Sequence, residues 1–164
     1  MIILIMGVSG SGKTTIGQHL AATLHWQFKD ADDFHPAENI EKMRQGMPLT
    51  DNDRTPWLLA LQHAIRSWIQ TNSNVILACS ALKSSYRQIL YQPSDPVRLV
   101  YLKGPFELIQ QRLNQRHGHY MKADLLESQF KALEEPENAL IVKIDQPPIA
   151  IVEQIKDGLG LTIQ

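Results

Sequence analysis

One eight-residue stretch near the start of the chain constrains its fold more than any other feature. Gly7 to Thr14 reads GVSGSGKT and fits the pattern G-x-x-x-x-G-K-[ST], which is typical of a phosphate-binding loop. The apolar run Ile2–Met6 precedes it, and an amphipathic stretch at Lys13–Leu24 follows it. A strand, a glycine-rich turn and a helix in this order predict an α/β protein with a parallel sheet.

The residue types of this loop suit a ligand that carries phosphate groups. Glycines let the backbone turn tightly, so that successive N–H groups point at phosphate oxygens, and the following helix adds the positive end of its dipole. Lys13 can reach the β- and γ-phosphates, and the Thr14 hydroxyl can ligate Mg²⁺. The alternative is a glycine-rich turn without a ligand. We predict that a nucleotide contacts Gly7, Val8, Ser9, Gly10, Ser11, Gly12, Lys13, Thr14 and Thr15.

The rest of the chain alternates apolar runs of strand length with stretches of helical period. The predicted strands are Ile2–Met6, Trp26–Lys29, Asn74–Cys79, Arg98–Lys103 and Ala139–Asp145. The predicted helices are Lys13–Leu24, 36–46, one that begins with Thr55 as its cap and Pro56 at its first position, Leu82–Tyr91, Phe106–Arg116, Lys122–Glu134 and Ile149–Asp157. This order predicts a three-layer α/β/α fold around a five-stranded parallel sheet.

Charge and cysteine content narrow the class of protein. The 164 residues carry 16 basic and 17 acidic side chains, so no overall positive field favours nucleic acid or an anionic membrane surface. Cys79 is the only cysteine and cannot form an internal disulfide. The run Ile2–Met6 is too short to span a bilayer and lacks the flanks of a signal peptide. We therefore predict a soluble, cytoplasmic protein with one domain at residues 1–164 and no nucleic-acid or membrane partner.

Other motifs separate the classes of nucleotide-binding protein. The chain contains no guanine-reading N-K-x-D and no LSGGQ signature. The letters D-x-x-G occur at Asp157–Gly160, past the last predicted strand, where they cannot hold a γ-phosphate switch. The chain is also short for a motor ATPase. These observations favour a compact small-molecule kinase, in which a lid closes over a nucleotide and a small acceptor.

Paired carboxylates follow the second predicted strand, at the edge where ligands bind in open α/β sheets. We assign Asp30 to the organisation of Mg²⁺ and Asp32 to catalysis, as the group that accepts the proton of the attacking hydroxyl. The alternative is an acidic turn that caps the helix near Pro36. His35 can donate to a sugar-like hydroxyl, or it can be structural.

Three cations are candidates for the acceptor side of the site. Arg54, Lys83 and, one helical turn beyond it, Arg87 suit a substrate with its own carboxylate, because charge-assisted pairing gives orientation and affinity. For each of them the alternative is a solvated surface cation. For Arg87 the two readings are equally supported.

A second group of candidates lies in the last third of the chain. Arg112 and Arg116 share one face of a predicted helix, and His117, Gly118 and His119 form a candidate hinge. Arginines from a mobile lid would stabilise the transferring phosphoryl group, so we assign Arg112 to ATP and Arg116 to catalysis, although the sequence does not separate their roles. The alternative is a solvated helix face. Gln146 and Pro147 are predicted beside the adenine, or they only begin a helix.

Taken together, these motifs resemble those of the gluconokinases, within the shikimate-kinase-like group of P-loop kinases. Shikimate kinases usually have a glycine triplet after the third strand, where this chain has Cys79-Ser-Ala-Leu-Lys83, and this departure argues against shikimate as the acceptor. The stretch H-P-x-x-N-I-x-K-M is far more specific than the phosphate loop. The resemblance runs through GVSGSGKT, DADDFHPAENIEKMRQGMPLTDNDRTPW, CSALKSSYR, YLKG, LLESQFKALEEP and VKIDQPP.

The resemblance implies a P-loop kinase fold with a mobile lid, which we place at about residues 105–135. It also implies ATP-dependent phosphorylation of D-gluconate at its C6 hydroxyl, with Mg²⁺ as cofactor, and a homodimer. One alternative is a kinase for another small carboxylated polyol such as shikimate. Another, from a different class, is a nucleotide-gated binding module that transfers no phosphoryl group.

Overall fold

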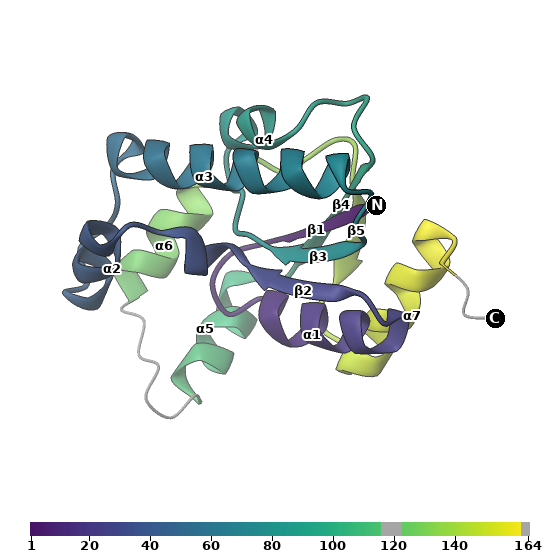
Figure 1. The fold of residues 1–164 in the computed structure, drawn as a ribbon. Coiled ribbons are helices and arrows are strands. Elements are labelled where there is room, and N and C mark those ends of the chain that lie inside the picture. The colour runs from purple at the N-terminus through teal and green to yellow at the C-terminus, as the bar shows by residue number, and fades with distance from the viewer. Residues whose placement is uncertain (116–122, 162–164) are drawn as a thin grey trace.

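A five-stranded parallel sheet forms the centre of the computed structural model, which describes residues 1–115 and 123–161 (Figure 1). Its strand order is β2-β3-β1-β4-β5, so the strand before the phosphate loop lies in the middle. Each pair of neighbours runs parallel, as the sequence predicted. The strands are β1 (Ile2–Met6), β2 (Gln27–Asp30), β3 (Val75–Ala78), β4 (Val97–Lys103) and β5 (Leu140–Lys143).

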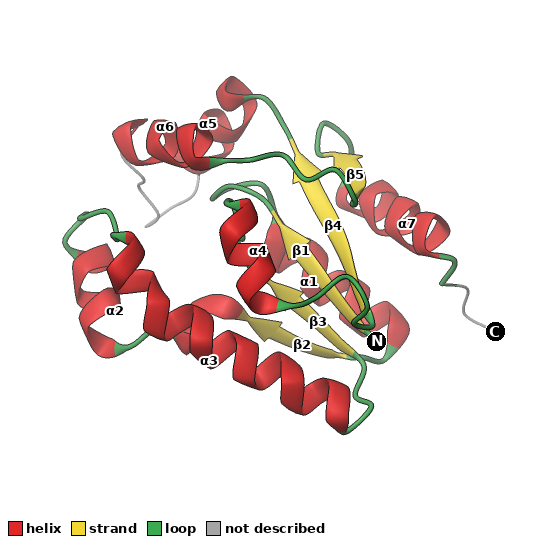
Figure 2. Cartoon of the chain, turned by 90° about the horizontal axis from the view of Figure 1, so that it is seen from above, coloured by secondary structure: helices red, strands yellow, loops and turns green. Residues whose placement is uncertain are grey.

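Helices cover both faces of the sheet, which confirms the predicted three layers. Helices α1 and α7 lie on one face and α3 and α4 on the other, while α2, α5 and α6 stand at the end where the strands finish (Figure 2). Their bounds are α1 (Lys13–Leu24), α2 (Ala37–Arg44), α3 (Asp51–Gln70), α4 (Ser84–Leu90), α5 (Phe106–Asn114), α6 (Ala123–Ala132) and α7 (Pro148–Leu159), and a short 3₁₀ helix, η1, spans Ala31–Phe34. Within the described ranges, no helix is long and apolar enough to cross a membrane.

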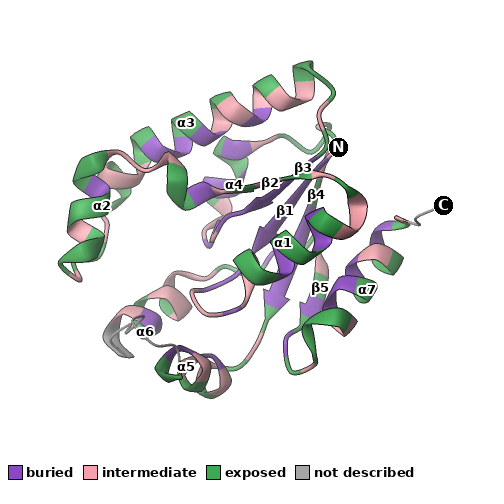
Figure 3. Ribbon diagram, turned by 60° about the horizontal axis from the view of Figure 1, so that its bottom comes forward, coloured by how far each residue is buried: buried purple, intermediate pink, exposed green. Residues whose placement is uncertain are grey.

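Alternate residues of β1 feed two separate hydrophobic cores. Ile3 and Ile5 pack with residues of α1 and α7, whereas Leu4 and Met6 pack on the opposite face with residues of α3 such as Leu61. Every residue of β1 is buried, and the central strands form the buried interior of the molecule (Figure 3). Burial on both faces explains why the central strands are continuously apolar in the sequence.

Helix α3 begins earlier than the sequence analysis predicted. We expected Thr55 to cap it, but the helix begins at Asp51, with Thr50 as its cap. The Thr50 hydroxyl accepts a hydrogen bond from the Asp53 amide (3.1 Å), and the Asp53 carboxylate accepts one from the Thr50 amide (2.9 Å). This reciprocal capping box stabilises the earlier start, and Pro56 is accommodated inside the helix at the cost of one backbone hydrogen bond. The early start brings the first turn of α3 to the site described next.

Candidate functional site

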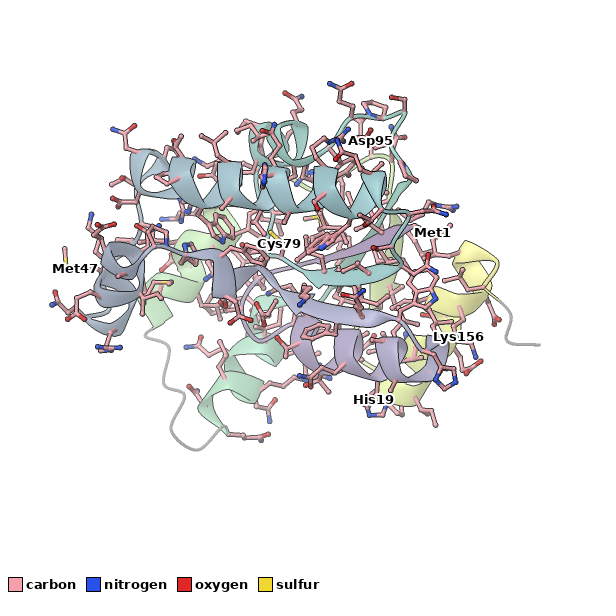
Figure 4. All side chains as sticks on the ribbon, viewed as in Figure 1. Met1, His19, Met47, Cys79, Asp95 and Lys156 are labelled. Carbon is pink, nitrogen blue, oxygen red and sulfur yellow. The ribbon has the colours of Figure 1, made fainter. Side chains whose placement is uncertain are left out.

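A cleft of about 1050 Å³ opens at the ends of β1, β2 and β3, beside the phosphate loop. Met47, which follows α2 and lines the cleft, lies at the opposite end of the molecule from Met1 (Figure 4). Cys79, just after β3, also lines the cleft, but burial raises the pKa of its thiol to about 12. The cleft brings together predicted residues from several elements, namely Ser9, Gly10, Gly12, Lys13, Thr14, Thr15, Asp30, Asp32, His35 and Arg54.

The phosphate loop has the backbone that its sequence demands. Gly10 (φ 83°) and Gly12 (φ 99°) adopt left-handed conformations, which favour glycine. Gly12 is the N-cap of α1 and has no side chain to cap the helix, and the N-terminus of a helix is a favourable place for an anion. The Lys13 ammonium donates to the carbonyl of Val8 (3.0 Å), at the far side of the loop. The loop therefore presents donors and positive charge to the cleft.

Glycine is also required in the loop because other groups come very close to it. A Cβ on Gly10 would lie 2.7 Å from Cγ of Leu113, a residue of α5. A Cβ on Gly7 would lie 2.6 Å from the Ser11 hydroxyl, which is buried. The phosphate loop thus packs directly against α5.

The two residues predicted to serve Mg²⁺ lie side by side. The Thr14 hydroxyl donates to Oδ2 of Asp30 (3.0 Å), and Oδ1 of Asp30 accepts from the Asp32 amide (3.0 Å). One hydroxyl and one carboxylate suit Mg²⁺, which usually takes few protein ligands and completes its shell with phosphate and water oxygens. In the part of the chain that the structure describes, no group of three or more His, Cys, Asp or Glu residues could hold a metal ion by itself.

Asp32 lies across the cleft from the phosphate loop. Its side chain is 79% exposed and faces the cleft, and the partial desolvation that the cleft imposes, together with the charge of Asp30, raises the pKa of its carboxyl. The positive charge of Lys13 opposes the shift. A raised pKa increases the basicity of the carboxylate, which suits a group that accepts a proton from a hydroxyl.

His35 is buried in the wall next to Asp32. Its ring stacks on Trp57 of α3, with centroids 4.4 Å apart and planes 10° apart, and the Trp57 indole N–H donates to the carbonyl of Ala31 (2.7 Å). Burial, helped by the charge of Arg54, lowers the pKa of His35 to about 4. The imidazole is therefore neutral at pH 7, and its Nε2 lies 3.9 Å from Oδ1 of Asp32.

Two of the three predicted acceptor cations, Arg54 and Lys83, meet around Tyr86, and of these two only Arg54 lines the cleft. Arg54 donates to the Tyr86 hydroxyl (3.1 Å), which in turn donates to the carboxylate of Asp51. Lys83 donates to the same carboxylate (3.1 Å) and lies 5.5 Å from the centroid of the Tyr86 ring. The hydrogen bond from Tyr86, with the one from Lys83, lowers the pKa of Asp51, and Asp51 raises the pKa of Lys83.

Arg87 does not face the cleft, in contrast to its predicted contact with the substrate. Its buried guanidinium donates to the backbone carbonyls of Ala81 (2.7 Å), Leu82 (3.2 Å) and Glu134 (2.9 Å). It therefore joins the loop after β3 to the segment after α6. The spacing of one helical turn from Lys83 does not reveal that three carbonyls surround the side chain.

The predictions for the lid and the adenine side have mixed outcomes. Arg116, His117, Gly118 and His119 lie outside the described residues. Arg112 and Gln146 line a second, smaller cavity, where Arg112 donates to the carbonyl of Ile144 (2.7 Å). Pro147 caps α7 and does not line this cavity, whereas its neighbour Pro148 does. Since both cavities share Gly10, Gly12 and Thr15, the phosphate loop separates them.

Sequence reasoning assigned no role to Gln129 of α6, which binds the phosphate loop at Ser9. Its Oε1 accepts from the Ser9 amide (2.7 Å), and its Nε2 donates to the Ser9 hydroxyl (2.9 Å). The motif LLESQFKALEEP contains this residue, but nothing in its pattern reveals a partner 120 positions away. The pair ties α6 to the loop at the edge of the cleft.

Comparisons with known proteins agree with the fold described above. The model of the shikimate kinase family matches residues 9–157. The thermoresistant gluconokinase of Escherichia coli is 44% identical, with 96% of this chain and 94% of that protein covered, and the thermosensitive gluconokinase of the same organism is 49% identical, with 87% and 77% covered. The crystal structure of a gluconokinase from Sinorhizobium meliloti superposes with a TM-score of 0.87 at 39% identity, over 96% of this chain and 90% of that one.

Proposed function

The chain belongs to the shikimate kinase family and, within it, to the gluconokinases, and from this premise we propose that it transfers the γ-phosphoryl group of ATP to the C6 hydroxyl of D-gluconate. The observation that carries the proposal is the single cleft in which the phosphate loop faces Asp32, His35 and Arg54. A phosphate site beside a wall of hydroxyl- and carboxylate-binding groups suits a small sugar acid as the acceptor.

On the nucleotide side, loop amides and Lys13 bind the phosphates, and the adenine lies in the smaller cavity beside Arg112 and Gln146. Thr14 and Asp30 would hold Mg²⁺, which when bound neutralises charge on the β- and γ-phosphate oxygens. The hydrogen bond between Thr14 and Asp30 supports this assignment.

On the acceptor side, Asp32 orients the attacking hydroxyl and accepts its proton. His35 binds a hydroxyl, and Arg54 pairs with the single carboxylate of gluconate, while Lys83 adds positive charge behind it. Transfer then depends on positioning and on electrostatic stabilisation, without a covalent intermediate on the protein.

The proposal includes the larger organisation expected from the sequence. Residues 1–164 form one kinase domain with a lid at about residues 105–135, in which Arg116 stabilises the transferring phosphoryl group. The enzyme works as a cytoplasmic homodimer, and light scattering of the purified protein measures its mass in solution.

Release of ADP with Mg-ATP, measured with D-gluconate, shikimate, other sugar acids or no acceptor, tests the function. We expect turnover with gluconate to exceed turnover with the other acceptors by orders of magnitude. The Asp32→Ala variant should remain folded and lose about 10²–10⁴-fold in kcat, the range for a positioned general base. Turnover with another acid alone would overturn the choice of acceptor, and ATP binding without any acceptor-dependent turnover would favour the binding module.

A further inference from the structure

The stretch H-P-x-x-N-I-x-K-M contains a buried amide that the proposed chemistry does not yet use. Asn39 lies in α2, is 3% exposed, and is one of the few buried polar residues described by the structure. Buried amides in a short helix are costly unless hydrogen bonds satisfy them. The partners of Asn39 therefore indicate what it does.

Two polar contacts of the Asn39 side chain involve the same atom, Nδ2. This nitrogen donates to the backbone carbonyl of Asp53 (2.7 Å) and lies 3.2 Å from Nδ1 of His35. Since a carbonyl can only accept, the group that faces Asp53 must be the NH₂ group. Its second hydrogen then points at Nδ1 of His35, which must accept it and so carries no proton. In a neutral imidazole the ring proton is consequently on Nε2.

The carbonyl that orients Asn39 is itself held in place. Asp53 belongs to the capping box of α3, and its carboxylate accepts a hydrogen bond from the Lys42 ammonium (2.8 Å). The hydrogen bond from Lys42, with that from the Thr50 amide, lowers the pKa of Asp53 to about 2, so this carboxylate stays charged at neutral pH. Asn39 fixes one edge of the His35 ring and Trp57 fixes its face. The remaining edge of the ring, which carries Nε2, is directed toward Asp32.

The distance between His35 and Asp32 allows one oxygen atom to contact both side chains. Nε2 and Oδ1 are 3.9 Å apart, too far for a direct hydrogen bond. An oxygen atom to one side of the line that joins the two atoms can lie about 2.8 Å from each of them. A hydroxyl there would donate its proton to Asp32 and accept one from Nε2–H.

We propose that Asn39 is a positioning residue, which keeps the His35 proton on Nε2 so that His35 and Asp32 together orient the attacking hydroxyl of the acceptor. A hydroxyl oxygen has four tetrahedral directions. Its carbon takes one, the hydrogen bond to Asp32 the second, and the hydrogen bond from His35 the third. These two hydrogen bonds fix the direction of the one remaining lone pair. Positioning contributes to the rate because this lone pair then points at the phosphorus atom of the γ-phosphate.

This inference rests on the proposed function, but its first test needs no substrate. The ¹⁵N chemical shifts of the His35 ring in the ligand-free protein at pH 7 report which nitrogen carries the proton. We expect Nε2 to be protonated and Nδ1 to be unprotonated. A proton on Nδ1 would overturn the inference even if the protein phosphorylates gluconate.

The second test changes the position of the His35 proton without removing the imidazole ring. In Asn39→Asp, a carboxylate replaces the amide and can only accept, so the His35 proton should move to Nδ1 or the ring should become charged. We expect kcat with gluconate to fall by about 10²-fold, the cost of a misplaced reacting group, while the KM for Mg-ATP is unchanged. The matched control is Glu38→Gln, which removes a charge from an exposed position on the same helix and should keep the Nε2 proton and kcat within about threefold.

A pair of variants at His35 covers the case in which Asn39→Asp does not fold. The amide nitrogen of His35→Gln can occupy the place of Nε2, whereas the amide of His35→Asn is too short to reach it. We expect His35→Gln to retain about tenfold more kcat than His35→Asn at equal thermal stability. Equal loss in the two variants, or wild-type kcat in Asn39→Asp with a displaced proton, would show that the position of the proton does not matter.

Discussion

The phosphate loop and the acceptor wall face the same cleft but are built in different ways. The loop is eight consecutive residues, and its binding groups are backbone amides that glycine conformations aim at a common point. The wall is made of side chains from η1, α2, α3 and the residue after η1, and among them His35, Asn39 and Arg54 are held by other side chains or by a carbonyl. A backbone site tolerates any ligand with phosphates, whereas a side-chain network selects one arrangement of hydroxyls and carboxylate. In the proposed function, the loop therefore binds the nucleotide and the wall selects the acceptor.

The largest effect should come from the one charged side chain of the loop that reaches into the cleft. Lys13→Ala should lower kcat by at least about 10²-fold with every acceptor, because the charge on the transferring group loses a stabilising partner. Steady-state ADP release measures it, and circular dichroism checks the fold. Lys29→Ala, at an exposed position on β2, is the matched control and should keep wild-type kcat. A loss confined to one acceptor would contradict the division between loop and wall.

A smaller effect should separate backbone strain from crowding in the loop. Gly10→Ala should reduce the free energy of unfolding by about 2–4 kcal/mol, of which about 1 kcal/mol is left-handed strain and the rest arises because its Cβ would come too close to Leu113 and Ile109 of α5. Gly46 is the matched control, since it also has a positive φ (75°) but a Cβ added to it would meet nothing within 4 Å. Gly46→Ala should cost only the left-handed strain, about 1 kcal/mol. Urea unfolding measures the loss of stability in both variants. Equal losses would show that α5 moves to accommodate the added methyl group without a free-energy cost.

A further effect is a pH dependence that belongs to the wall. The pKa of His35 is about 4 in the folded protein and 6.5 in its ordinary state, so the unfolded chain binds more protons between these values. The stabilising contribution is complete above pH 6.5 and is lost as the pH falls toward 4. Thermal unfolding at several pH values should show this slope in the wild type and a shallower one in His35→Gln. An unchanged slope in the variant would show that other groups cause the dependence.

The sequence predicts the phosphate loop and its flanking elements better than it predicts the wall. The bounds of β1 and α1 agree with the prediction at both ends, because the apolar run, the glycines and the helical stripe are local signals. The polar composition of β2 is explained by its place in the sheet, because it is an edge strand in which Gln27 and Lys29 are exposed. Strand order alone decides that this edge strand delivers Asp30 to the loop.

Contacts between distant segments were beyond sequence reasoning. The side chain of Arg87 is surrounded by three carbonyls, one of them 47 residues away, so its spacing from Lys83 carried no information about its role. Asn39 and Gln129 stand inside motifs that the sequence displays, yet their partners become visible only when α2 meets α3 and α6 meets the loop. The start of α3 was different, because Thr50 and Asp53 are a local capping signal that we overlooked in favour of Thr55 and Pro56.

The hydrogen bonds between Ser9 and Gln129 have a thermodynamic consequence for the loop. An N–H group serves one strong acceptor at a time, and the Ser9 amide already has one in Oε1 of Gln129. A phosphate oxygen that takes this amide does so by exchange, and the amide group of Gln129 must find water or another partner. Nucleotide binding at this position is then a competition between two acceptors, so its free energy is the difference between two hydrogen bonds.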